Sequence, residues 1–523
     1  MRMSVGFALP APFDGYRRTM PSPLEDYAII GDLRTTAIVS RGGSIDWWAA
    51  PRFDSEACFC ALVGSDDAGH WSIAPLAAVR TTERRYRDNS LVLETLFETE
   101  GGRVRVTDCV LIDCVQPTIV RTVVGLTGRV TLRSACHPRF YYGYLPASLR
   151  GSEGELYAIA GPDALVLRSS LAAHWEGKTA VSEFTVEHDE SATFVLSWYP
   201  SHRKPPPPFD AAAYVQKTDA WWQRWAARCL YDGPWREAVV RSCRGCADTK
   251  TPNPCASAMM RRRNFNWASM AKCSRLSNSR SGGAWRSTRK RGAPCANCWI
   301  SSKRSGARRA AASGKRAGGR QYVDSKMMAW VAFDRGLRLA KSTALDAPVV
   351  HWEAVRERIA RQVSANGFDP ERGAFTQYYG SQELDATALL FPMYGFLPYD
   401  DERMRSTVRA LESELLDGGF LYRYSKDVTQ GDADATPAEG TFIACGFWLA
   451  ANYARSGCRA DGEQLFERLL AIRNDVGLLS EDYDTTCGRL VGTCPRPCRT
   501  PISSKRRSRL VRSAVRSTID VTS

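Results

Sequence analysis

Long apolar runs are missing from this sequence of 523 residues, and no stretch approaches the roughly 20 apolar residues that a membrane-spanning helix needs. We therefore expect no membrane contact. The first 16 residues lack a basic segment followed by an apolar run of sufficient length, so no secretory signal peptide is indicated and we expect a cytoplasmic protein. Histidine is also scarce: the six histidines are isolated from one another in sequence, so we infer no metal site and no cofactor.

Acidic residues are almost absent between Arg241 and Arg320, where 20 Lys or Arg accompany the single acid Asp248. The tail from Thr493 is also basic, with eight Lys or Arg and one acid, Asp520. These stretches carry net charges of +19 and +7 out of a formal total of +15, so the rest of the chain is acidic, at −11. The charge of the whole chain therefore gives no support to a nucleic-acid partner, and we expect none.

Cysteine follows the same division, because six of the 17 cysteines lie between Cys243 and Cys298. The C-x-x-C pairs that begin at Cys243 and Cys295 have the form of structural zinc ligands. The gap between the pairs is longer than in the usual zinc ribbon or finger, and the stretch lacks apolar periodicity, so we expect no zinc there. Outside the basic stretches, unpaired cysteines such as Cys109 and Cys229 fit a reducing compartment.

The basic stretch allows a second interpretation, because low hydrophobicity with high net charge is typical of a disordered segment. Such a segment could bind nucleic acid or another acidic partner. The alternative function is therefore a non-enzymatic protein that keeps a β-sandwich and binds through residues 241–320.

A change of reading frame explains the basic stretches better. If each codon is read from the third base of one residue through the first two bases of the next, Asn266 and Trp267 can give only Leu, and Trp267 and Ala268 can give only Gly. In that frame residues 263–273 can read Q-F-Q-L-G-V-Y-G-E-M, residues 305–316 can read W-R-E-A-R-R-G-I-W-E-T, and residues 492–506 can read N-L-P-Q-A-L-S-H-T-H-L-I-Q-A. Codon freedom makes a single match uninformative, but three coherent strings in one frame are informative. We interpret residues 241–320 and 493–523 as frameshifted.

The N-terminal part is strand-like from Leu24 to about Ser201, with short β-branched runs separated by Gly, Pro and Asp. Because no helical segments separate these runs, they predict an antiparallel β-sandwich over residues 24–209. Residues 1–23 are predicted to be a flexible N-terminus. Residues 210–240 are predicted to be a linker and a first helix.

After Gln321 the apolar period becomes helical, as it is for Trp330, Phe333 and Leu337. The predicted helices are 325–340, 349–365, 401–416, 442–454 and 461–473. Sugar-cleaving helical barrels have this pattern, but other all-α enzymes and helical repeats have it too.

Six motifs, taken in order along the chain, carry a resemblance to a known family. They are D-Y-A-I-I-G-D at 26–32, G-S-I-D-W-W at 43–48, P-R-F-D-S at 51–55, Q-Y-V-D-S-K at 321–326, E-G-T-F-I-A-C-G-F-W at 439–448 and R-N-D-V-G-L-L-S-E-D-Y-D at 473–484. Together they resemble the bacterial glucoamylase and trehalase family, glycoside hydrolase family 15. The resemblance covers about residues 24–240 and 321–492, and the hidden strings resemble the family too.

This resemblance implies an N-terminal antiparallel β-sandwich followed by an (α/α)6-type helical barrel. The barrel is expected to be incomplete here, with residues 321–492 as its remnant. It also implies an exo-acting, inverting hydrolase of α-glucosidic bonds, acting on an α-glucoside or oligosaccharide without a metal. Such an enzyme needs a carboxylic acid that protonates the glycosidic oxygen and a carboxylate that deprotonates a water.

Glu481 matches the catalytic base of the family. Without the resemblance, the residues themselves would also allow Glu481 to be a solvated glutamate in a loop. The resemblance also suggests that Glu439, Phe442 and Trp448 line sugar subsites, although Phe442 and Trp448 suit a helix core equally well. Trp47 and Trp48 have the same two interpretations.

The general acid of the family is the Glu of the G-I-W-E string, whose codon in this chain would straddle Gly314 and Lys315. No carboxylate is therefore present at that place, and a cationic Lys315 cannot replace it. Loss of a general acid typically lowers the rate by roughly 10²- to 10⁴-fold, so we expect this copy to be impaired.

Overall fold

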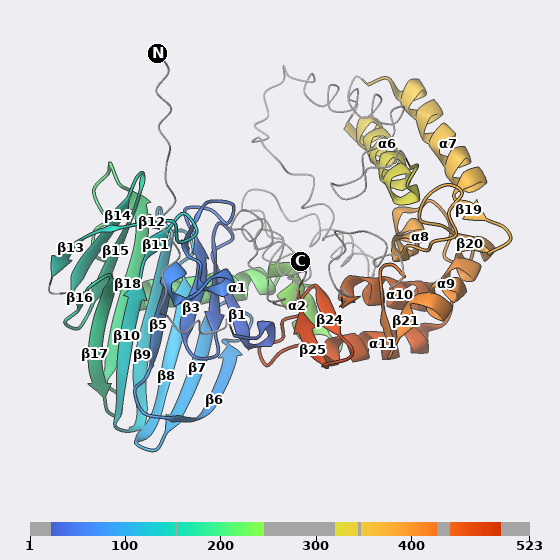
Figure 1. Ribbon diagram of the computed structural model, residues 1–523. Coiled ribbons are helices and arrows are strands. Elements are labelled where there is room, and N and C mark those ends of the chain that lie inside the picture. Colours follow the sequence, from blue (N-terminus) through green and yellow to red (C-terminus); the bar gives the residue numbers. More distant parts are fainter. Residues whose placement is uncertain (1–21, 153, 245–319, 344–346, 426–439, 493–523) are drawn as a thin grey trace, which may run out of the picture. The chain divides into compact units, whose positions relative to one another are not determined.

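The computed structural model describes residues 22–152, 154–244, 320–343, 347–425 and 440–492 (Figure 1). Two compact units divide the chain after Ala227. Most of the segments predicted to be flexible or frameshifted, namely 1–21, 245–319 and 493–523, lie outside the described residues. Among the described residues, no helix is both long and apolar enough to cross a membrane.

Unit 1 contains two antiparallel sheets of eight described strands each (Figure 1). Sheet A has the order β1-β2-β3-β5-β10-β17-β16, with β4 paired to β3; sheet B has the order β13-β14-β15-β18-β9-β8-β7-β6. The strands of sheet A are β1 (Tyr27–Gly31), β2 (Thr36–Ser40), β3 (Ser44–Ala49), β4 (Ala57–Phe59), β5 (His70–Pro75), β10 (Val130–His137), β16 (His174–Glu176) and β17 (Thr179–Val186). Those of sheet B are β6 (Val79–Tyr86), β7 (Leu93–Thr99), β8 (Gly102–Val110), β9 (Thr118–Gly128), β13 (Ser148–Ser152), β14 (Glu155–Ala160), β15 (Asp163–Ser169) and β18 (Ser191–Pro200).

Short elements complete unit 1. They are the 3-10 turns η1 (Leu24–Asp26), η2 (Ala61–Val63) and η3 (Asp66–Ala68), the paired strands β11 (Arg139–Phe140) and β12 (Leu145–Pro146), and helix α1 (Ala211–Ala226). Side chains alternate along the strands: in β10, Val130, Leu132 and Cys136 are buried, whereas Thr131 is exposed. One face of each sheet therefore forms a core, and the predicted antiparallel sandwich is confirmed.

A buried arginine on sheet B joins the two sheets. Arg121 on β9 lies opposite Asp108 on β8, and its Nε donates to Asp108 Oδ1 at 2.7 Å; both side chains have no exposed surface. The two terminal nitrogens donate to the carbonyl oxygens of Trp71 and Gly43 in sheet A, each at 2.7 Å. The guanidinium carbon lies 5.1 Å from the centre of the Trp71 ring. Charge, hydrogen bonds and ring contact together compensate for the burial of this arginine.

Gly43 can approach the arginine and its own sheet because it has no side chain. Its φ is +80°, and a Cβ at this position would lie 2.4 Å from the carbonyl oxygen of Ile73. This glycine opens the motif 43–48, so the motif has a backbone requirement independent of any chemistry.

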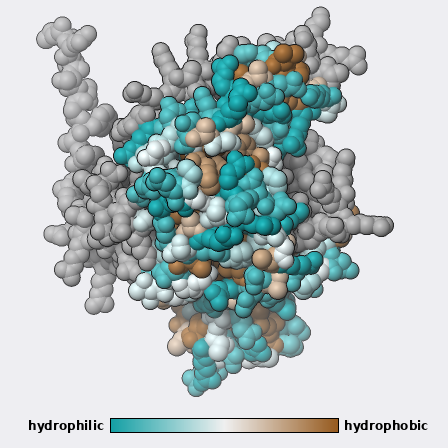
Figure 2. Space-filling model, turned by 90° about the vertical axis from the view of Figure 1, so that its right-hand side faces the viewer, coloured by the Kyte–Doolittle hydropathy of each residue, from teal (hydrophilic) through white to brown (hydrophobic). Residues whose placement is uncertain are grey.

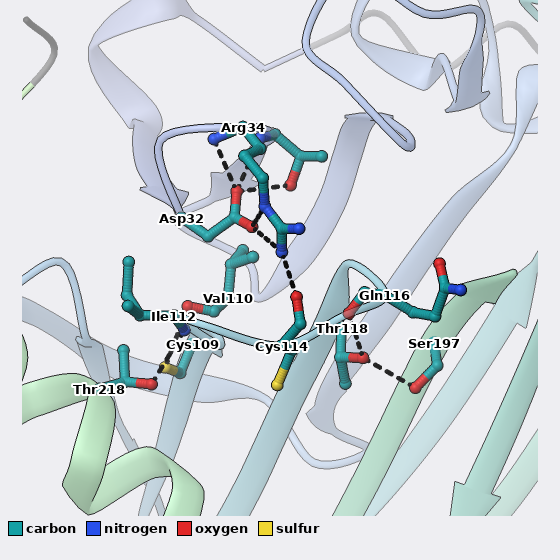
Figure 3. Close-up of polar contacts among 11 residues, drawn as sticks. Asp32, Arg34, Cys109, Val110, Ile112, Cys114, Gln116, Thr118, Ser197 and Thr218 are labelled. Atoms are coloured by element: carbon teal, nitrogen blue, oxygen red, sulfur yellow. Dashed lines mark hydrogen bonds and ion pairs between the residues drawn. The ribbon is translucent and has the colours of Figure 1, made fainter. Parts of the chain in front are cut away.

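The first motif ends in the turn between β1 and β2, where Asp32 is almost fully buried (Figure 3). Asp32 Oδ1 accepts hydrogen bonds from the backbone N–H groups of Arg34 (2.9 Å) and Thr35 (2.7 Å). The Arg34 guanidinium in turn donates to Asp32 and to the carbonyl oxygen of Cys114 (2.7 Å), in the loop between β8 and β9. Asp32 therefore serves the fold by closing a turn and orienting an arginine that links two loops.

Several polar side chains lie on the outer face of sheet A. The Tyr27 hydroxyl donates to Asp46 Oδ2 (2.9 Å), and burial raises the pKa of the Asp46 carboxyl. Farther along the face, His137 Nδ1 lies 3.1 Å from Thr179 Oγ1. Burial lowers the pKa of His137 to about 4, so its imidazole is neutral at neutral pH.

Unit 2 is mainly helical in its described part. Its helices are α2 (Arg236–Arg244), α6 (Val323–Thr343), α7 (Val349–Asn366), α8 (Phe391–Tyr394), α9 (Glu402–Leu415), α10 (Ile443–Arg455) and α11 (Arg459–Ala471), with the 3-10 helix η5 (Ala386–Leu390). Its strands are β19 (Phe368–Asp369), β20 (Ala374–Phe375), β21 (Leu416–Asp417), β22 (Phe420–Leu421), β23 (Thr441–Phe442), β24 (Asp482–Asp484) and β25 (Arg489–Val491). The five predicted helices are confirmed, with ends that differ by a few residues.

One large apolar cluster holds the helices of unit 2 together. Its buried members come mainly from α6, η5, α8, α9 and α10, with others from α7, β20 and β22, and they include Met327, Phe391, Leu411 and Leu449. Apolar side chains also remain exposed on the first helices, among them Leu339 on α6 and Val350 on α7. Figure 2 shows apolar patches within the largely hydrophilic surface of the face that it presents. Whether the barrel is incomplete stays a prediction.

We predict that Arg121→Met opens the sandwich, because it leaves the Asp108 carboxylate buried without its partner. Removal of one member of a buried ion pair costs about 3–5 kcal/mol. The matched control is Arg133→Met, since Arg133 pairs with Glu176 and Glu183 on the surface of sheet A and such pairs contribute up to about 1 kcal/mol.

Hydrogen exchange of the backbone amides of β8 and β9, measured by mass spectrometry on the full chain, checks this prediction. We expect exchange to accelerate strongly in Arg121→Met and little in Arg133→Met. Equal protection in the two variants would contradict the central role of the buried arginine.

Candidate active site

Glu481 lies between a tight loop and strand β24. Asn474 closes the loop by accepting two backbone hydrogen bonds on its side-chain oxygen. The carbonyl oxygen of Glu481 accepts a hydrogen bond from the N–H of Ile443, the first residue of α10, at 3.0 Å. Ser480 and Asp482 on either side are buried, whereas Glu481 is partly exposed. The main chain at Glu481 is therefore held at the N-terminal end of α10, where the helix dipole favours negative charge.

Strands β23 and β24 join the last two motifs, because Phe442 pairs with Asp482 in antiparallel register. Phe442 is partly exposed, and its ring centre lies 6.2 Å from that of Trp448. Trp448 is buried in the apolar cluster of unit 2, with 4% of its surface exposed. The structure thus brings Phe442 beside the segment of Glu481. It places Trp448 in the helix core, which was the second interpretation of this residue.

A buried carboxylate and an arginine lie on elements that contact this region. Asp385 caps η5 by accepting the N–H of Thr387 (2.9 Å), and the N–H of Ala386 donates to the carbonyl oxygen of Arg423 (3.1 Å). Arg423 Nε lies 3.7 Å from Asp385 Oδ1. Helix α10 contacts η5 and is tied to it by Asn452, whose side-chain nitrogen donates to a carbonyl oxygen of η5.

The guanidinium of Arg423 is only partly engaged within the described residues. Its Nε is buried and has no hydrogen-bond partner there, while 36% of the side chain is exposed. Its carbon lies 4.9 Å from the centre of the Tyr424 ring. An arginine held in this way presents N–H donors that suit hydroxyl or carboxylate oxygens.

The start of α6 joins the same region. The N–H of Val323 donates to the carbonyl oxygen of Gln377 (3.0 Å), so the motif 321–326 is fixed against the segment that leads to Asp385. Asp324, in the first turn of α6, interacts electrostatically with Asp385 and Arg423. Several buried polar atoms here lack hydrogen-bond partners among the described residues: Tyr322 Oη, Gln377 Oε1 and Tyr379 Oη. We call the set Tyr322, Asp324, Gln377, Tyr379, Asp385 and Arg423 the polar cluster.

Burial dominates the electrostatics of the polar cluster. It raises the pKa of the Asp385 carboxyl, and the positive charge of Arg423 opposes this shift. Burial also raises the pKa of Tyr379 to about 12. The tyrosine is therefore a neutral donor at neutral pH, and the cluster offers hydrogen-bonding groups that water solvates poorly.

The other predicted site residues lie elsewhere. Trp47 and Trp48 are on β3 of unit 1, with exposed fractions of 3% and 0%, and their predicted role in a sugar subsite stays a prediction. Glu439, Gly314 and Lys315 lie outside the described residues. Sequence reasoning missed Asp385 and Arg423. The only sequence signal for Arg423 was its position between Tyr422 and Tyr424, and an arginine between two tyrosines is a weak indication of a binding site.

The part of the chain that the structure describes contains no group of three or more His, Cys, Asp or Glu side chains placed to hold a metal ion. The nine cysteines whose side chains the structure describes are free thiols. Asp484, the last residue of β24, accepts hydrogen bonds from the N–H groups of Thr486 (2.9 Å) and Cys487 (3.2 Å).

The order of a β-sandwich followed by helices is also found in a solved structure that matches nearly the whole chain. The crystal structure of a bacterial glucoamylase complexed with acarbose superposes with a TM-score of 0.60 at 9% identity, covering 98% of this chain and 95% of that one. This match confirms the predicted fold class, a sandwich followed by a helical barrel of the (α/α)6 type.

Sequence comparisons then identify the family. The model of glycosyl hydrolases family 15 matches residues 315–496, and the model of the trehalase-like N-terminal domain matches residues 17–197. A trehalase of Mycobacterium tuberculosis is 27% identical over 91% of this chain and 87% of its own length. A trehalase of Thermoplasma volcanium is 35% identical over 34% of this chain and 28% of its own. These matches agree with the motifs and support a trehalase- or glucoamylase-like protein of glycosyl hydrolase family 15.

We predict that Asp385→Ala destabilises the surroundings of η5 by about 2–4 kcal/mol, because a cap and a buried ionic partner are both lost. Asp401→Ala is the matched control. Asp401 also caps a helix by accepting an N–H two residues later, and it also pairs with an arginine, but at the surface.

The control variant should cost about 1 kcal/mol, the usual value of an N-cap. Hydrogen exchange of the amides of η5 and α8 in the full chain measures the first effect, and exchange of the first turn of α9 measures the second. Equal costs would show that burial of Asp385 beside Arg423 contributes nothing.

Proposed function

We propose that the activity encoded by this chain is exo-acting, inverting hydrolysis of the α-glucosidic bond of trehalose or a related α-glucoside, with Glu481 as the general base. The observation that carries the proposal is the position of Glu481. It is a partly exposed carboxylate residue on a fixed main chain, joined to α10 and to the motif 439–448 by hydrogen bonds. The relatives named trehalase and the glucoamylase-like fold support the substrate class.

In the proposed mechanism, Glu481 removes a proton from a water that attacks the anomeric carbon from the face opposite the leaving group. A second carboxyl group protonates the departing oxygen, and inversion requires the two carboxyl groups to be roughly 6.5–9.5 Å apart. Arg423, oriented by Asp385, donates hydrogen bonds to sugar hydroxyl oxygens. The phenol of Tyr379 supplies a further neutral donor.

We propose further that the present chain lacks the second carboxyl group. The support is the basic composition of residues 241–320 and the hidden string G-I-W-E, whose Glu codon would straddle Gly314 and Lys315. A base without its acid should hydrolyse poorly any substrate whose leaving group needs a proton.

This proposal predicts different behaviour toward two substrates. Trehalose has a sugar leaving group that must be protonated, so its hydrolysis should be about 10²- to 10⁴-fold slower than in a complete enzyme of the family. α-Glucosyl fluoride releases fluoride with little need of an acid, so its hydrolysis should survive and give β-glucose, observable by proton NMR. Glu481→Gln should abolish the fluoride reaction.

Glu402→Gln is the control for that variant, because Glu402 is a surface carboxylate on α9; it should leave the rate unchanged. Circular dichroism of each variant separates loss of folding from loss of the base. Trehalose hydrolysis at the rate of a complete enzyme would contradict the missing acid. Fluoride hydrolysis that is insensitive to Glu481→Gln would exclude Glu481 as the base.

The frame hypothesis has its own test in the DNA. Resequencing the gene across the codons for 241–320 and from 492 onward should show whether the hidden frame is continuous with the codons that follow. A continuous frame predicts a protein with the G-I-W-E glutamate and full activity on the α-glucoside. Confirmation of the present frame predicts the impaired chain described above.

A further inference from the structure

Two histidines that are far apart in sequence meet on the outer face of sheet A. His70 begins β5 and His137 ends β10, and the two are direct partners in the antiparallel register. β5 and β10 are neighbours in sheet A (Figure 1). The adjacent residues Trp71 and Cys136 are buried in the sandwich, so the histidine side chains point away from that core. The imidazole rings are stacked, with centres 6.2 Å apart and planes at 26°.

The Nδ1 atom of each ring is occupied. His70 Nδ1 lies 3.1 Å from the carbonyl oxygen of Asp66, which can only accept, so Nδ1 is the donor here and Nε2 is the ring nitrogen left for another partner. His137 Nδ1 lies 3.1 Å from Thr179 Oγ1. Imidazoles that ligate metals have this arrangement, in which a hydrogen bond at one nitrogen orients the other nitrogen toward the ion.

The Nε2 atom of His137 is buried and has no hydrogen-bond partner among the described residues. A buried ring nitrogen without a partner is unfavourable and calls for an explanation. A ligand that accepts its lone pair would provide one, and so would a donor that the structure does not contain.

The separation of the rings fits one shared ion. A Zn–N bond of about 2.0–2.1 Å, extended by ~1.1 Å to the ring centre, limits two rings on one ion to a separation of about 6.4 Å. The observed 6.2 Å is inside this limit. A tetrahedral N–metal–N angle would place the two ring centres about 5 Å apart. Rotation of the histidine side chains can bring the rings this close without moving the strands.

The charged groups around the pair are nearly balanced. Asp46 on the neighbouring strand β3 acts on His70, and Asp67 acts on His137. Arg139 and Lys178 oppose the acids at His137. Imidazole nitrogens near carboxylates suit zinc, nickel or copper, whereas magnesium and calcium prefer sites built from oxygen alone.

We propose that His70 and His137 form a two-histidine binding site for a divalent transition-metal ion, Zn²⁺, Ni²⁺ or Cu²⁺, on the outer face of sheet A. Water completes the coordination of the ion. The ion bridges β5 and β10, so it binds the folded sandwich and stabilises it by mass action. The argument for this site does not rest on the proposed glycosidase activity.

The test uses the full chain with its thiols alkylated, because cysteines also bind these metals. After removal of metal with a chelator, Zn²⁺ and Ni²⁺ binding are measured by titration calorimetry, and Cu²⁺ binding by electron paramagnetic resonance. Wild type should bind one ion of each metal with nitrogen ligands. His70→Asn and His137→Asn should each weaken binding at least tenfold.

His188→Asn is the matched control. His188 also places its Nδ1 against a carbonyl oxygen, that of Leu126, but it has no facing histidine among the described residues. This variant should bind the metals as wild type does. Binding that is unchanged in His70→Asn and His137→Asn would overturn the proposal.

A second measurement does not depend on the folding of any variant. Hydrogen exchange of wild type with and without Zn²⁺ should show added protection in β5 and β10. Metal binding without protection of these strands would place the ion elsewhere and would equally overturn the proposal.

Discussion

The buried ion pair of Arg121 and Asp108 is the interaction on which unit 1 depends most directly. It lies within sheet B, yet the terminal nitrogens of the arginine donate to the carbonyl oxygens of Trp71 on β5 and of Gly43 in the turn between β2 and β3. A charged pair with no exposed surface is costly to bury unless every donor finds an acceptor. The spacing of the two sheets is therefore limited, because the carbonyl oxygen of Gly43 must lie within hydrogen-bond distance of Arg121. This constraint gives a structural reason for the glycine that begins the motif at 43–48.

Unit 2 uses a buried charge in a different way. Asp385 caps η5 and lies beside Arg423, and main-chain hydrogen bonds connect these elements to each other. The same kind of main-chain contact ties Glu481 to the first residue of α10. Charged and polar side chains are thus carried by short, irregular segments, while the helices provide the apolar cluster that holds those segments still. Enzymes commonly carry functional side chains on loops that a rigid scaffold of helices or strands holds in place.

Much of the fold could be predicted because its signals are local. Side chains alternate along the strands of unit 1, and the helical period of residues such as Trp330, Phe333 and Leu337 marks α6; both patterns need only the neighbouring residues. The short elements η5 and α8 were missed because a buried apolar run of this length has no period to read. Their position depends on contacts with α9 and α10. Of the candidate site, Glu481 and Phe442 were found through motifs, whereas Asp385 and Arg423 were not, since their pairing joins separate segments.

Motifs, periodicity and charge are properties of consecutive residues, so the family resemblance, the order of sandwich and helices, and the abrupt change of composition after Arg241 could all be predicted from the sequence. The tertiary structure alone decided which residues meet. Histidines that stand isolated along the chain become direct neighbours once β5 and β10 pair, and Trp448, which the sequence left between core and sugar site, is buried in the core. The physical reason is that strand register and helix packing are fixed by contacts between distant segments, and no local pattern contains them.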